Sequence, residues 1–246
     1  MEINISNLKK TYGNKTAVDI SEFKASRGEI IGLLGNNGAG KTTLFRLMLD
    51  LTDANEGSVN MTFNTSTDDR PDATLQVNPA KSEEWKKYTG AYMDESFLID
   101  FLTPEEYFDF IGRVCDMTKE QIHERMACFE QFMDNEILGQ KKYIREFSAG
   151  NKQKIGIIAA MFNRPQLLVL DEPFNFLDPS SQMMLKKIIY DYSHESGATI
   201  FISSHNLQHT VDLSTRVALL EHGVIIKDLP NHEGSAEKEL EDYFRI

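Results

Sequence analysis

Residues 35 to 43 have the sequence Gly35-Asn36-Asn37-Gly38-Ala39-Gly40-Lys41-Thr42-Thr43, and they follow an apolar run over residues 30–34. Glycines let backbone N–H groups converge on phosphate oxygens, Lys41 can reach the β and γ phosphates, and the Thr42 hydroxyl can ligate Mg²⁺. A helical pattern follows, with an apolar face formed by Leu44, Leu47, Met48 and Leu51. The positive end of that helix points at the anion. This stretch therefore predicts a strand, a loop and a helix that together bind a nucleoside triphosphate.

The chain has 246 residues, with 26 Lys and Arg against 38 Asp and Glu and a net charge of −12. This length allows one large α/β domain or two small ones. The negative charge argues against a nucleic-acid partner and against direct binding to anionic lipid, so any link to a membrane should run through a protein. We expect a cytoplasmic protein, because no apolar run approaches the length of a bilayer span and the N-terminus lacks the features of a signal peptide.

Strand and helix signals flank a helical block in the middle of the chain. Before the block, Gly57 begins an alternating strand that includes Val59, Met61 and Phe63, and the polar residues 64–73 indicate a surface loop or an elaborated hairpin. Capping-box signals begin at Thr103 and again at Thr118. The first of these helices has a predicted apolar face formed by Tyr107, Phe110, Ile111 and Val114. Residues 103 to about 136 are therefore predicted to be a helical lobe inserted into an α/β core.

The two cysteines, Cys115 and Cys128, lie in this helical stretch and lack the spacing of a metal site. Both are expected to be plain buried or half-buried thiols.

Two acids, Asp171 and Glu172, follow the apolar run Leu167-Leu168-Val169-Leu170. At the end of a buried strand, one acid can hold Mg²⁺ through water and the next can orient or deprotonate an attacking water. Two acids that only cap a turn before Pro173 would be the alternative if this run stood alone. Phe147 to Lys154 precede it at a distance that fits one helix, and Ser148 and Gly150 would offer a hydroxyl and bare backbone N–H groups at its start. Further on, the pattern predicts a helix that ends at Gly197 and a strand over 199–203, which implies parallel βαβ units.

These residues together resemble the nucleotide-binding subunit of ABC transporters over nearly the whole chain. The resemblance implies an α/β fold of the P-loop NTPase type, with a RecA-like core sheet, an antiparallel β subdomain and an α-helical subdomain over 103–146 inserted in a single domain, 1–246. It also implies ATP and Mg²⁺ as ligands. In this resemblance Tyr12 matches the aromatic that stacks on adenine, Ser148 to Asn151 match the signature sequence, Asp171 matches the metal-holding acid, Glu172 matches the catalytic base, Asp178 lies in the dimer-facing loop, and His205 matches the histidine that contacts the γ-phosphate.

The resemblance further implies a second nucleotide-binding subunit, expected to be an identical copy, which sandwiches ATP between the phosphate loop of one subunit and the signature sequence of the other. The helical lobe would carry motion to a separately encoded transmembrane permease subunit. Hydrolysis of the sandwiched ATP would release the pair. The expected location is the cytoplasmic face of the membrane, through the permease, and the expected direction of transport is export.

Three positions of the signature depart from the family's usual residues, namely Phe147, Ala149 and Asn151, while Ser148 and Gly150 are kept. In the loop that enters the helical lobe, Asp94 stands where the family usually has a glutamine that serves the metal. The stretch 60–88 departs from the family pattern without a functional explanation. Two other functions remain open from the sequence. One is a soluble ABC-type ATPase outside transport, and the other is a non-hydrolysing regulatory subunit, suggested only by Asp94.

Overall fold

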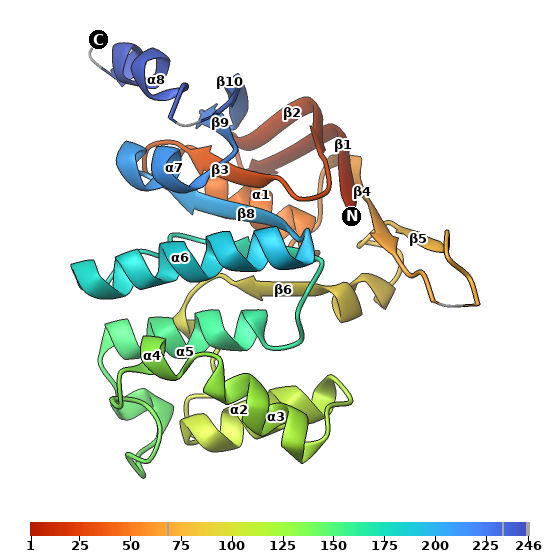
Figure 1. Cartoon of the computed structure of the whole chain (residues 1–246). Coiled ribbons are helices and arrows are strands. Elements are labelled where there is room, and N and C mark those ends of the chain that lie inside the picture. The colour runs from red at the N-terminus through yellow and green to blue at the C-terminus, as the bar shows by residue number, and fades with distance from the viewer. Residues whose placement is uncertain (68, 233, 245–246) are drawn as a thin grey trace.

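The computed structural model describes residues 1–67, 69–232 and 234–244, and it contains two β-sheets with helices around them (Figure 1). The larger sheet has six strands in the order β10-β9-β3-β8-β7-β6. Its strands are β3 (Ile30–Leu34), β6 (Thr89–Tyr92), β7 (Leu167–Leu170), β8 (Thr199–Ser204), β9 (Arg216–Glu221) and β10 (Val224–Pro230). All neighbouring pairs are parallel except β9 and β10. The predicted parallel βαβ core is confirmed.

The apolar runs become the buried centre of this sheet. Every residue of β3, β7 and β8 is buried, as expected for parallel strands covered on both faces. Leu34 pairs with Ser204, and Leu170 pairs with Ile202, so the ends of these three strands lie at one edge of the sheet. The segments that follow them begin at Gly35, Asp171 and His205. The register of the sheet thus gathers three widely separated parts of the chain.

The smaller sheet is antiparallel, with the order β2-β1-β4-β5. Its strands are β1 (Glu2–Tyr12), β2 (Lys15–Ala25), β4 (Glu56–Asn64) and β5 (Thr74–Val77). Val59, Met61 and Phe63 are buried along β4, which confirms the predicted alternation. Asn64 pairs with Thr74, so the polar residues between them close a β4–β5 hairpin, with residue 68 outside the described residues.

Helix α1 (Lys41–Met48) packs in the core shared by the two sheets. Phe45 meets Phe201 of the parallel sheet edge to face, with ring centroids 6.3 Å apart. Leu44, Leu47 and Met48 are buried as predicted, but Leu51 is 47% exposed. The prediction for Leu51 was wrong because α1 stops at Met48 and Asp50 adopts a left-handed backbone with φ +52°.

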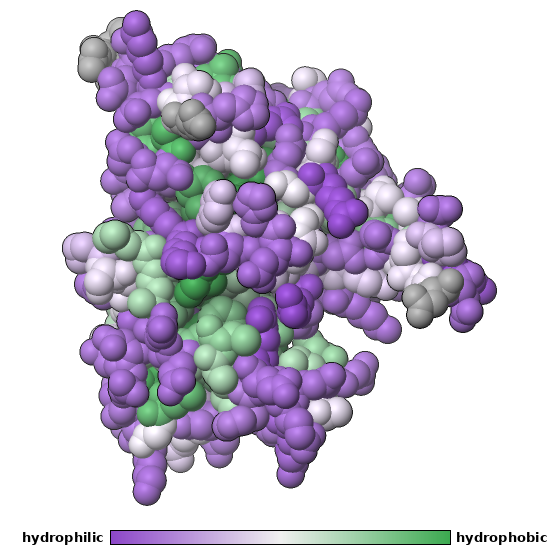
Figure 2. Space-filling view, in the orientation of Figure 1, coloured by the Kyte–Doolittle hydropathy of each residue, from purple (hydrophilic) through white to green (hydrophobic). Residues whose placement is uncertain are grey.

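Four further helices pack outside the core that contains α1 (Figure 1). They are α5 (Ala149–Met161), α6 (Pro179–Ser196), α7 (Leu207–Leu213) and α8 (Glu237–Phe244). Gly197 ends α6 in a left-handed conformation, as the sequence predicts. Figure 2 shows a largely hydrophilic surface in this view, with hydrophobic side chains gathered over the region of α5 and α6. Among the described residues, no helix is both long enough and apolar enough to cross a bilayer.

Between β6 and α5 the chain forms short helices, namely η2 (Glu95–Phe97), α2 (Pro104–Val114), α3 (Lys119–Ala127), α4 (Glu130–Met133) and η3 (Ile144–Glu146). The further 3₁₀ helix η1 (Glu84–Tyr88) precedes β6. Both predicted capping boxes are present, with Thr103 accepting from the Glu106 N–H and Thr118 accepting from the Gln121 N–H.

The predicted apolar face of α2 was partly wrong. Phe108 is fully buried and stacks on Phe162, the C-cap of α5, with ring centroids 5.6 Å apart, whereas Phe110 and Val114 are exposed. The helix is rotated so that Tyr107 and Phe108 face α5 together. Cys128 is also exposed, because it caps the end of α3 with its side chain outside the core, and only Cys115 is half-buried as expected.

Candidate functional site

The predicted phosphate loop turns from β3 into α1 and borders a cavity. The N-cap of α1 is Gly40, with φ +114°, so no side chain stands over the first N–H groups of the helix. Lys41 is only 6% exposed, and its Nζ donates to the Gly35 carbonyl at 2.6 Å. The cavity, of about 310 Å³, is lined by Tyr12, Lys15, Ala17, Asn36, Asn37, Gly38, Ala39, Gly40, Lys41, Thr42, Thr43 and Glu172. The structure thus gathers residues 36–43 of the predicted phosphate loop, Tyr12 and Glu172 around one space, whereas Gly35 does not line it.

Tyr12 lies at the end of β1 and is half exposed. Its ring is not packed into the core, and Lys10 Nζ lies 5.0 Å from the ring centroid. A half-exposed ring beside the phosphate loop can stack on a planar base.

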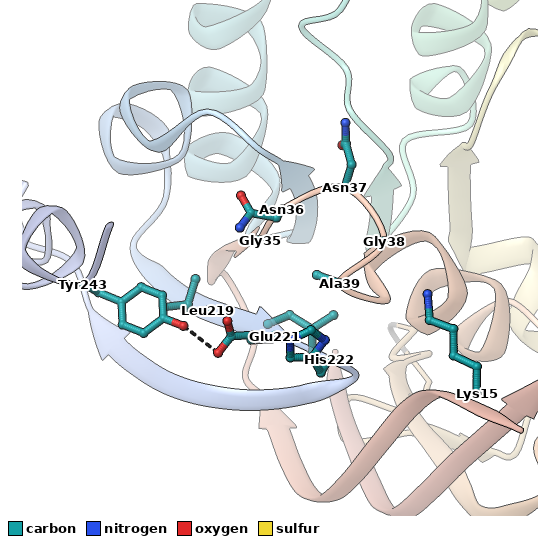
Figure 3. A pocket seen from close by; sticks show the side chains of 11 residues that line it. Lys15, Gly35, Asn36, Asn37, Gly38, Ala39, Leu219, Glu221, His222 and Tyr243 are labelled. Carbon is teal, nitrogen blue, oxygen red and sulfur yellow. Dashed lines mark hydrogen bonds between the residues drawn. The ribbon is translucent and has the colours of Figure 1, made fainter. Parts of the chain in front are cut away.

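A second cavity, of about 240 Å³, lies on the other side of the loop, between it and the β9–β10 turn (Figure 3). Five residues line both cavities, namely Lys15, Asn36, Asn37, Gly38 and Ala39. Tyr243 of α8 donates to Glu221 at 2.6 Å, which ties the C-terminal helix to this turn. No sequence signal indicates this contact between α8 and the surroundings of the phosphate loop.

Asp171 follows β7 and is held by two hydroxyl groups. Thr42 Oγ1 donates to Asp171 Oδ2 at 2.6 Å, and Ser203 Oγ donates to Asp171 Oδ1. Burial raises the pKa of Asp171 above its ordinary value, while the hydrogen bonds from Ser203 and Thr42 act in the opposite direction. A buried carboxylate of this kind is stabilised by any cation that binds beside it.

The side-chain oxygens of Thr42 and Asp171 are suitable ligands for Mg²⁺. Hydroxyl and carboxylate oxygens are the hard ligands that Mg²⁺ prefers, and adjacent ligands of an octahedral Mg²⁺ lie about 2.9 Å apart. The 2.6 Å separation of Thr42 Oγ1 and Asp171 Oδ2 is close to that spacing. Within the described parts of the chain, no group of three or more His, Cys, Asp and Glu side chains could hold a metal by itself. Mg²⁺ usually keeps several waters or phosphate oxygens as ligands, so one hydroxyl and one carboxylate are enough protein ligands for it.

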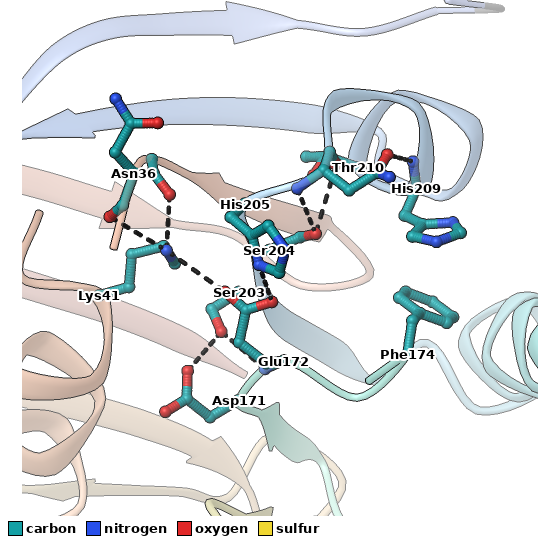
Figure 4. Close-up of polar contacts among 12 residues, drawn as sticks. Asn36, Lys41, Asp171, Glu172, Phe174, Ser203, Ser204, His205, His209 and Thr210 are labelled. Carbon is teal, nitrogen blue, oxygen red and sulfur yellow. Dashed lines mark hydrogen bonds and ion pairs between the residues drawn. The ribbon is translucent and has the colours of Figure 1, made fainter. Parts of the chain in front are cut away.

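Glu172 stands between a lysine and a histidine (Figure 4). Its Oε1 lies 3.3 Å from Lys41 Nζ, and its Oε2 lies 2.9 Å from His205 Nδ1. The Glu172 backbone is left-handed, with φ +47°, which costs about 1–2 kcal/mol for a residue with a Cβ. Its N–H donates to Ser203 Oγ at 2.8 Å, so the same serine that binds Asp171 also orients Glu172. The structure thus brings together Lys41, Glu172 and His205, the three residues that the sequence predicts to be catalytic.

Ser148 is the N-cap of α5, and its hydroxyl accepts from the Asn151 N–H at 3.2 Å. A Cβ added to Gly150 would lie 2.6 Å from the Phe176 carbonyl oxygen, so this glycine is needed for a close approach within the chain. Ser148 and Gly150 are not among the described residues that line the 310 Å³ cavity. The neighbouring Ala149 lines a different cavity beside Asp171 and Glu172, so the start of α5 lies near the two acids but does not line the cavity at the phosphate loop.

Comparisons with known proteins settle the family. The sequence model described as ABC transporter matches residues 18–175. This chain belongs to the ABC transporter family. The ABC transporter ATP-binding protein YhaQ of Bacillus subtilis (strain 168) is 33% identical to it over 222 residues, which are 90% of this chain and 68% of YhaQ. The bacitracin transport ATP-binding protein BcrA of Enterococcus faecalis is 30% identical over 231 residues, covering 92% of this chain and 68% of BcrA.

A solved structure supports the same fold. A dimeric ATP-binding cassette in a post-hydrolysis state, bound to ADP and phosphate, covers 94% of this chain with a TM-score of 0.78 at 18% identity. The predicted ABC-type α/β fold is confirmed. As an ATP-binding subunit of an ABC transporter, the chain binds ATP and hydrolyses it in support of transport. Subunits of this family pair with one another and with transmembrane subunits.

Two predicted residues of this ABC subunit act locally as helix caps. Asp178 is the N-cap of α6, and hydrogen bonds from Ser180 and Ser181 hold the pKa of its carboxyl well below the ordinary value. Asp94 is the N-cap of η2 and accepts from the Ser96 N–H at 2.8 Å. Asp94 also lines a cavity of about 180 Å³ together with Asp171 and Glu172. Its predicted service to the metal stays a prediction.

The structure also brings residues to the site that the sequence analysis did not single out. Ser203 contacts both acids, and Gln153 of α5 donates to the Glu172 carbonyl at 3.1 Å. The Ser-Ser-His stretch at the end of β8 was the available signal for Ser203. Gln153 could be found only from the packing of α5 against the end of β7.

Proposed function

We propose that this chain is the ATP-hydrolysing subunit that energises a separately encoded transmembrane permease, and that the pair is an exporter. The observation that carries the proposal is the convergence of Lys41, Glu172 and His205 beside the phosphate loop. A cation, a carboxylate and an imidazole in contact are what hydrolysis of a bound triphosphate needs. A role in transport is supported by the similarity to a bacitracin transport ATP-binding protein, and the direction of export is part of the proposal.

Within the proposed site, the loop amides and Lys41 bind the β and γ phosphates of ATP, and Tyr12 stacks on the adenine. Mg²⁺, when bound beside Thr42 and Asp171, neutralises charge that develops on the phosphates. Glu172 accepts a proton from the attacking water, because its carboxylate reaches the same space as Lys41 Nζ. His205 holds the Glu172 carboxylate from the other side and is free at its second ring nitrogen to contact the γ-phosphate.

We further propose that two copies of the chain form an ATP sandwich. Ser148 and Gly150 do not line the 310 Å³ cavity at the phosphate loop, and in the proposed pair they meet ATP bound to the other copy. The α5 N-terminus then contributes its positive end to the γ-phosphate, and Asp178 lies in the loop that faces the other copy. ATP stabilises the dimer because only the closed state binds it from both sides.

The helices of residues 103–146 form the proposed lobe that contacts the permease. Phe110 and Val114 of α2 expose apolar surface, and so do Phe97 and Phe101, which precede this lobe in the chain. A groove of about 340 Å³ beside them is lined in part by Phe97, Leu98, Tyr107 and Ile111. Its proposed occupant is a cytoplasmic segment of the permease, which would keep the subunit at the cytoplasmic face of the membrane.

The variant Glu172→Gln tests the proposal, because it keeps the shape of the site and removes the base. We expect its ATP hydrolysis to fall at least a hundredfold, and size-exclusion chromatography with ATP and Mg²⁺ to show a larger dimer fraction than the parent. ADP in place of ATP is the control and should leave both proteins monomeric. Parental hydrolysis by a monomeric Glu172→Gln protein would contradict both the base and the sandwich.

Co-purification from detergent-solubilised membranes separates the transporter from a soluble ABC-type ATPase outside transport. We expect a polytopic membrane protein to be retained by the tagged parent. Its retention should be lost in a Phe110→Asp, Val114→Asp double variant that still hydrolyses ATP. Retention of soluble proteins alone would favour the second function.

A further inference from the structure

The backbone of Glu172 is held on both sides by side chains that do not themselves reach the nucleotide cavity. Its N–H donates to Ser203 Oγ at 2.8 Å, and its carbonyl accepts from Gln153 Nε2 at 3.1 Å. With φ +47°, the left-handed turn is disfavoured for glutamate and persists only where the surroundings impose it. A relaxed turn would redirect the Glu172 carboxylate away from Lys41 and His205.

Gln153 projects from α5 and is 4% exposed. Its amide can be oriented in only one way, because the Glu172 carbonyl accepts and therefore requires the amide nitrogen. The amide oxygen then faces Tyr92, whose hydroxyl donates to it at 3.0 Å. Both ends of the Gln153 side chain are thus satisfied, which fixes the amide in place.

Tyr92 ends β6 and is 4% exposed. A Cβ on Gly156 would lie 2.1 Å from the Tyr92 ring, so the absence of a side chain at Gly156 makes the room that the ring occupies against α5. The Tyr92 hydroxyl is the donor in this pair, because the Gln153 amide oxygen that it meets can only accept. The Tyr92 carbonyl also accepts from the Asp171 N–H at 2.9 Å.

We propose that Tyr92 and Gln153 are positioning residues for ATP hydrolysis, in which the Tyr92 hydroxyl orients the Gln153 amide and the amide holds the left-handed turn of Glu172. The inference rests on the proposed role of Glu172 as the base. Because Gln153 and the N-cap Ser148 lie on the same helix, the base is aligned only while α5 keeps its packing against β6 and β7.

The experiment uses the full-length chain and two substitutions that keep side-chain shape. Gln153→Met preserves length without a donor, and Tyr92→Phe removes one hydroxyl. We expect kcat for ATP hydrolysis to fall about tenfold in Gln153→Met and about threefold in Tyr92→Phe, while the Kd for ADP stays within twofold of the parent. The double variant should be no slower than Gln153→Met, because both changes act through one contact.

Tyr192→Phe is the matched control. Tyr192 is also a buried tyrosine, and its hydroxyl donates to the Pro165 carbonyl at 2.5 Å, away from Glu172. We expect it to lower the unfolding temperature as Tyr92→Phe does while leaving kcat within twofold of the parent. A kcat within twofold of the parent in both Tyr92→Phe and Gln153→Met would overturn the inference, and so would multiplicative effects in the double variant.

If Gln153→Met does not fold, the kcat of Tyr92→Phe alone tests the positioning role, since Tyr92→Phe leaves Gln153 in place. Glu172→Gln, assayed in parallel, separates this inference from the proposed function. If Glu172→Gln hydrolyses ATP at the parental rate, the base itself is misassigned. If Glu172→Gln is inactive while Tyr92→Phe and Gln153→Met match the parent, only the positioning role fails.

Discussion

The N-termini of α1 and α5 are both predicted to face phosphate, yet the chain builds them differently. At α1 the N-cap is a glycine, and the buried Lys41 and Asp171 stand close to it. At α5 the Ser148 hydroxyl already accepts from the Asn151 N–H, and Lys152 of the first turn is paired with Glu95 at 3.2 Å. The difference lies in the caps. No side chain caps the first N–H groups of α1, whereas the Ser148 hydroxyl occupies one N–H group at the start of α5. A chain built in this way should bind nucleotide through α1 alone and use α5 only when another copy presents its ATP.

Lys41→Ala should have the largest effect, because it removes the cation at the α1 end. We expect ATP affinity of the isolated chain to fall at least tenfold, since a charge-assisted contact to two phosphates is lost in a partly buried site. Lys152→Ala, at the α5 end, should leave that affinity within twofold. Equilibrium binding of ATP at a protein concentration that keeps the chain monomeric measures both. Equal losses of ATP affinity in the two variants would show that the two helix ends do not differ in this way.

Gly150→Ala tests whether the α5 end serves ATP or only the fold of its own chain. The added Cβ would press on the Phe176 carbonyl at 2.6 Å, and a backbone atom moves only if the loop before α6 shifts. We expect the ATP-dependent dimer fraction and hydrolysis to fall about tenfold, together with a lower unfolding temperature. ADP affinity of the monomer should remain parental. Loss of ADP affinity would mean that the two ends form one site within a single chain.

Asp171→Asn tests how the buried carboxylate near the α1 end affects stability. A buried acid whose folded pKa is raised contributes stability below its unfolded pKa and loses it as pH rises toward the folded pKa. At pH values above the folded pKa, burial of the ionised Asp171 therefore destabilises the folded parent, and the uncharged asparagine avoids this loss. We expect Asp171→Asn to unfold at a higher temperature than the parent at pH 7. Each kcal/mol of added unfolding free energy raises the unfolding temperature by about 2–4 °C for a chain of this size. The difference in unfolding temperature between the two proteins should disappear at acidic pH. A lower unfolding temperature at pH 7 would show that the hydroxyl contacts outweigh burial.

Much of the fold and of the α1 end could be predicted from sequence because the signals are local. The phosphate loop, the apolar strands and the capping boxes at Thr103 and Thr118 each lie within a few consecutive residues. The errors came where rotation or exposure depends on distant packing. Phe108 replaced Phe110 in the core because α5 presents Phe162 to it, and nothing near Phe108 in the sequence encodes that neighbour. Gln153 escaped notice for the same reason, since its partners are Tyr92 and Glu172.

Asp94 should have the smallest effect, because it already has a local partner. Its carboxylate caps η2 through Ser96 and also lines the cavity beside Asp171 and Glu172. If the Asp94 carboxylate reaches Mg²⁺ directly or through water, its attraction to the ion exceeds its repulsion from a single phosphate oxygen. Two unit charges 4 Å apart interact by about 4 kcal/mol at an effective dielectric of 20. Solvent and distance reduce that figure, so we expect Asp94→Ala to raise the half-saturating Mg²⁺ concentration for ATP hydrolysis only about threefold.

Asp94→Asn is the matched variant that separates charge from capping. An asparagine oxygen still accepts from the Ser96 N–H, so the turn into η2 is kept while the charge is removed. If Asp94 serves the metal by its charge, the Mg²⁺ curves of Asp94→Asn and Asp94→Ala shift together. A shift in Asp94→Ala alone would assign the effect to the cap, and superimposable curves for parent and both variants would remove Asp94 from the metal site. In either of those outcomes the α1 end would hold its metal through Thr42 and Asp171 without help from the loop that enters the helical lobe.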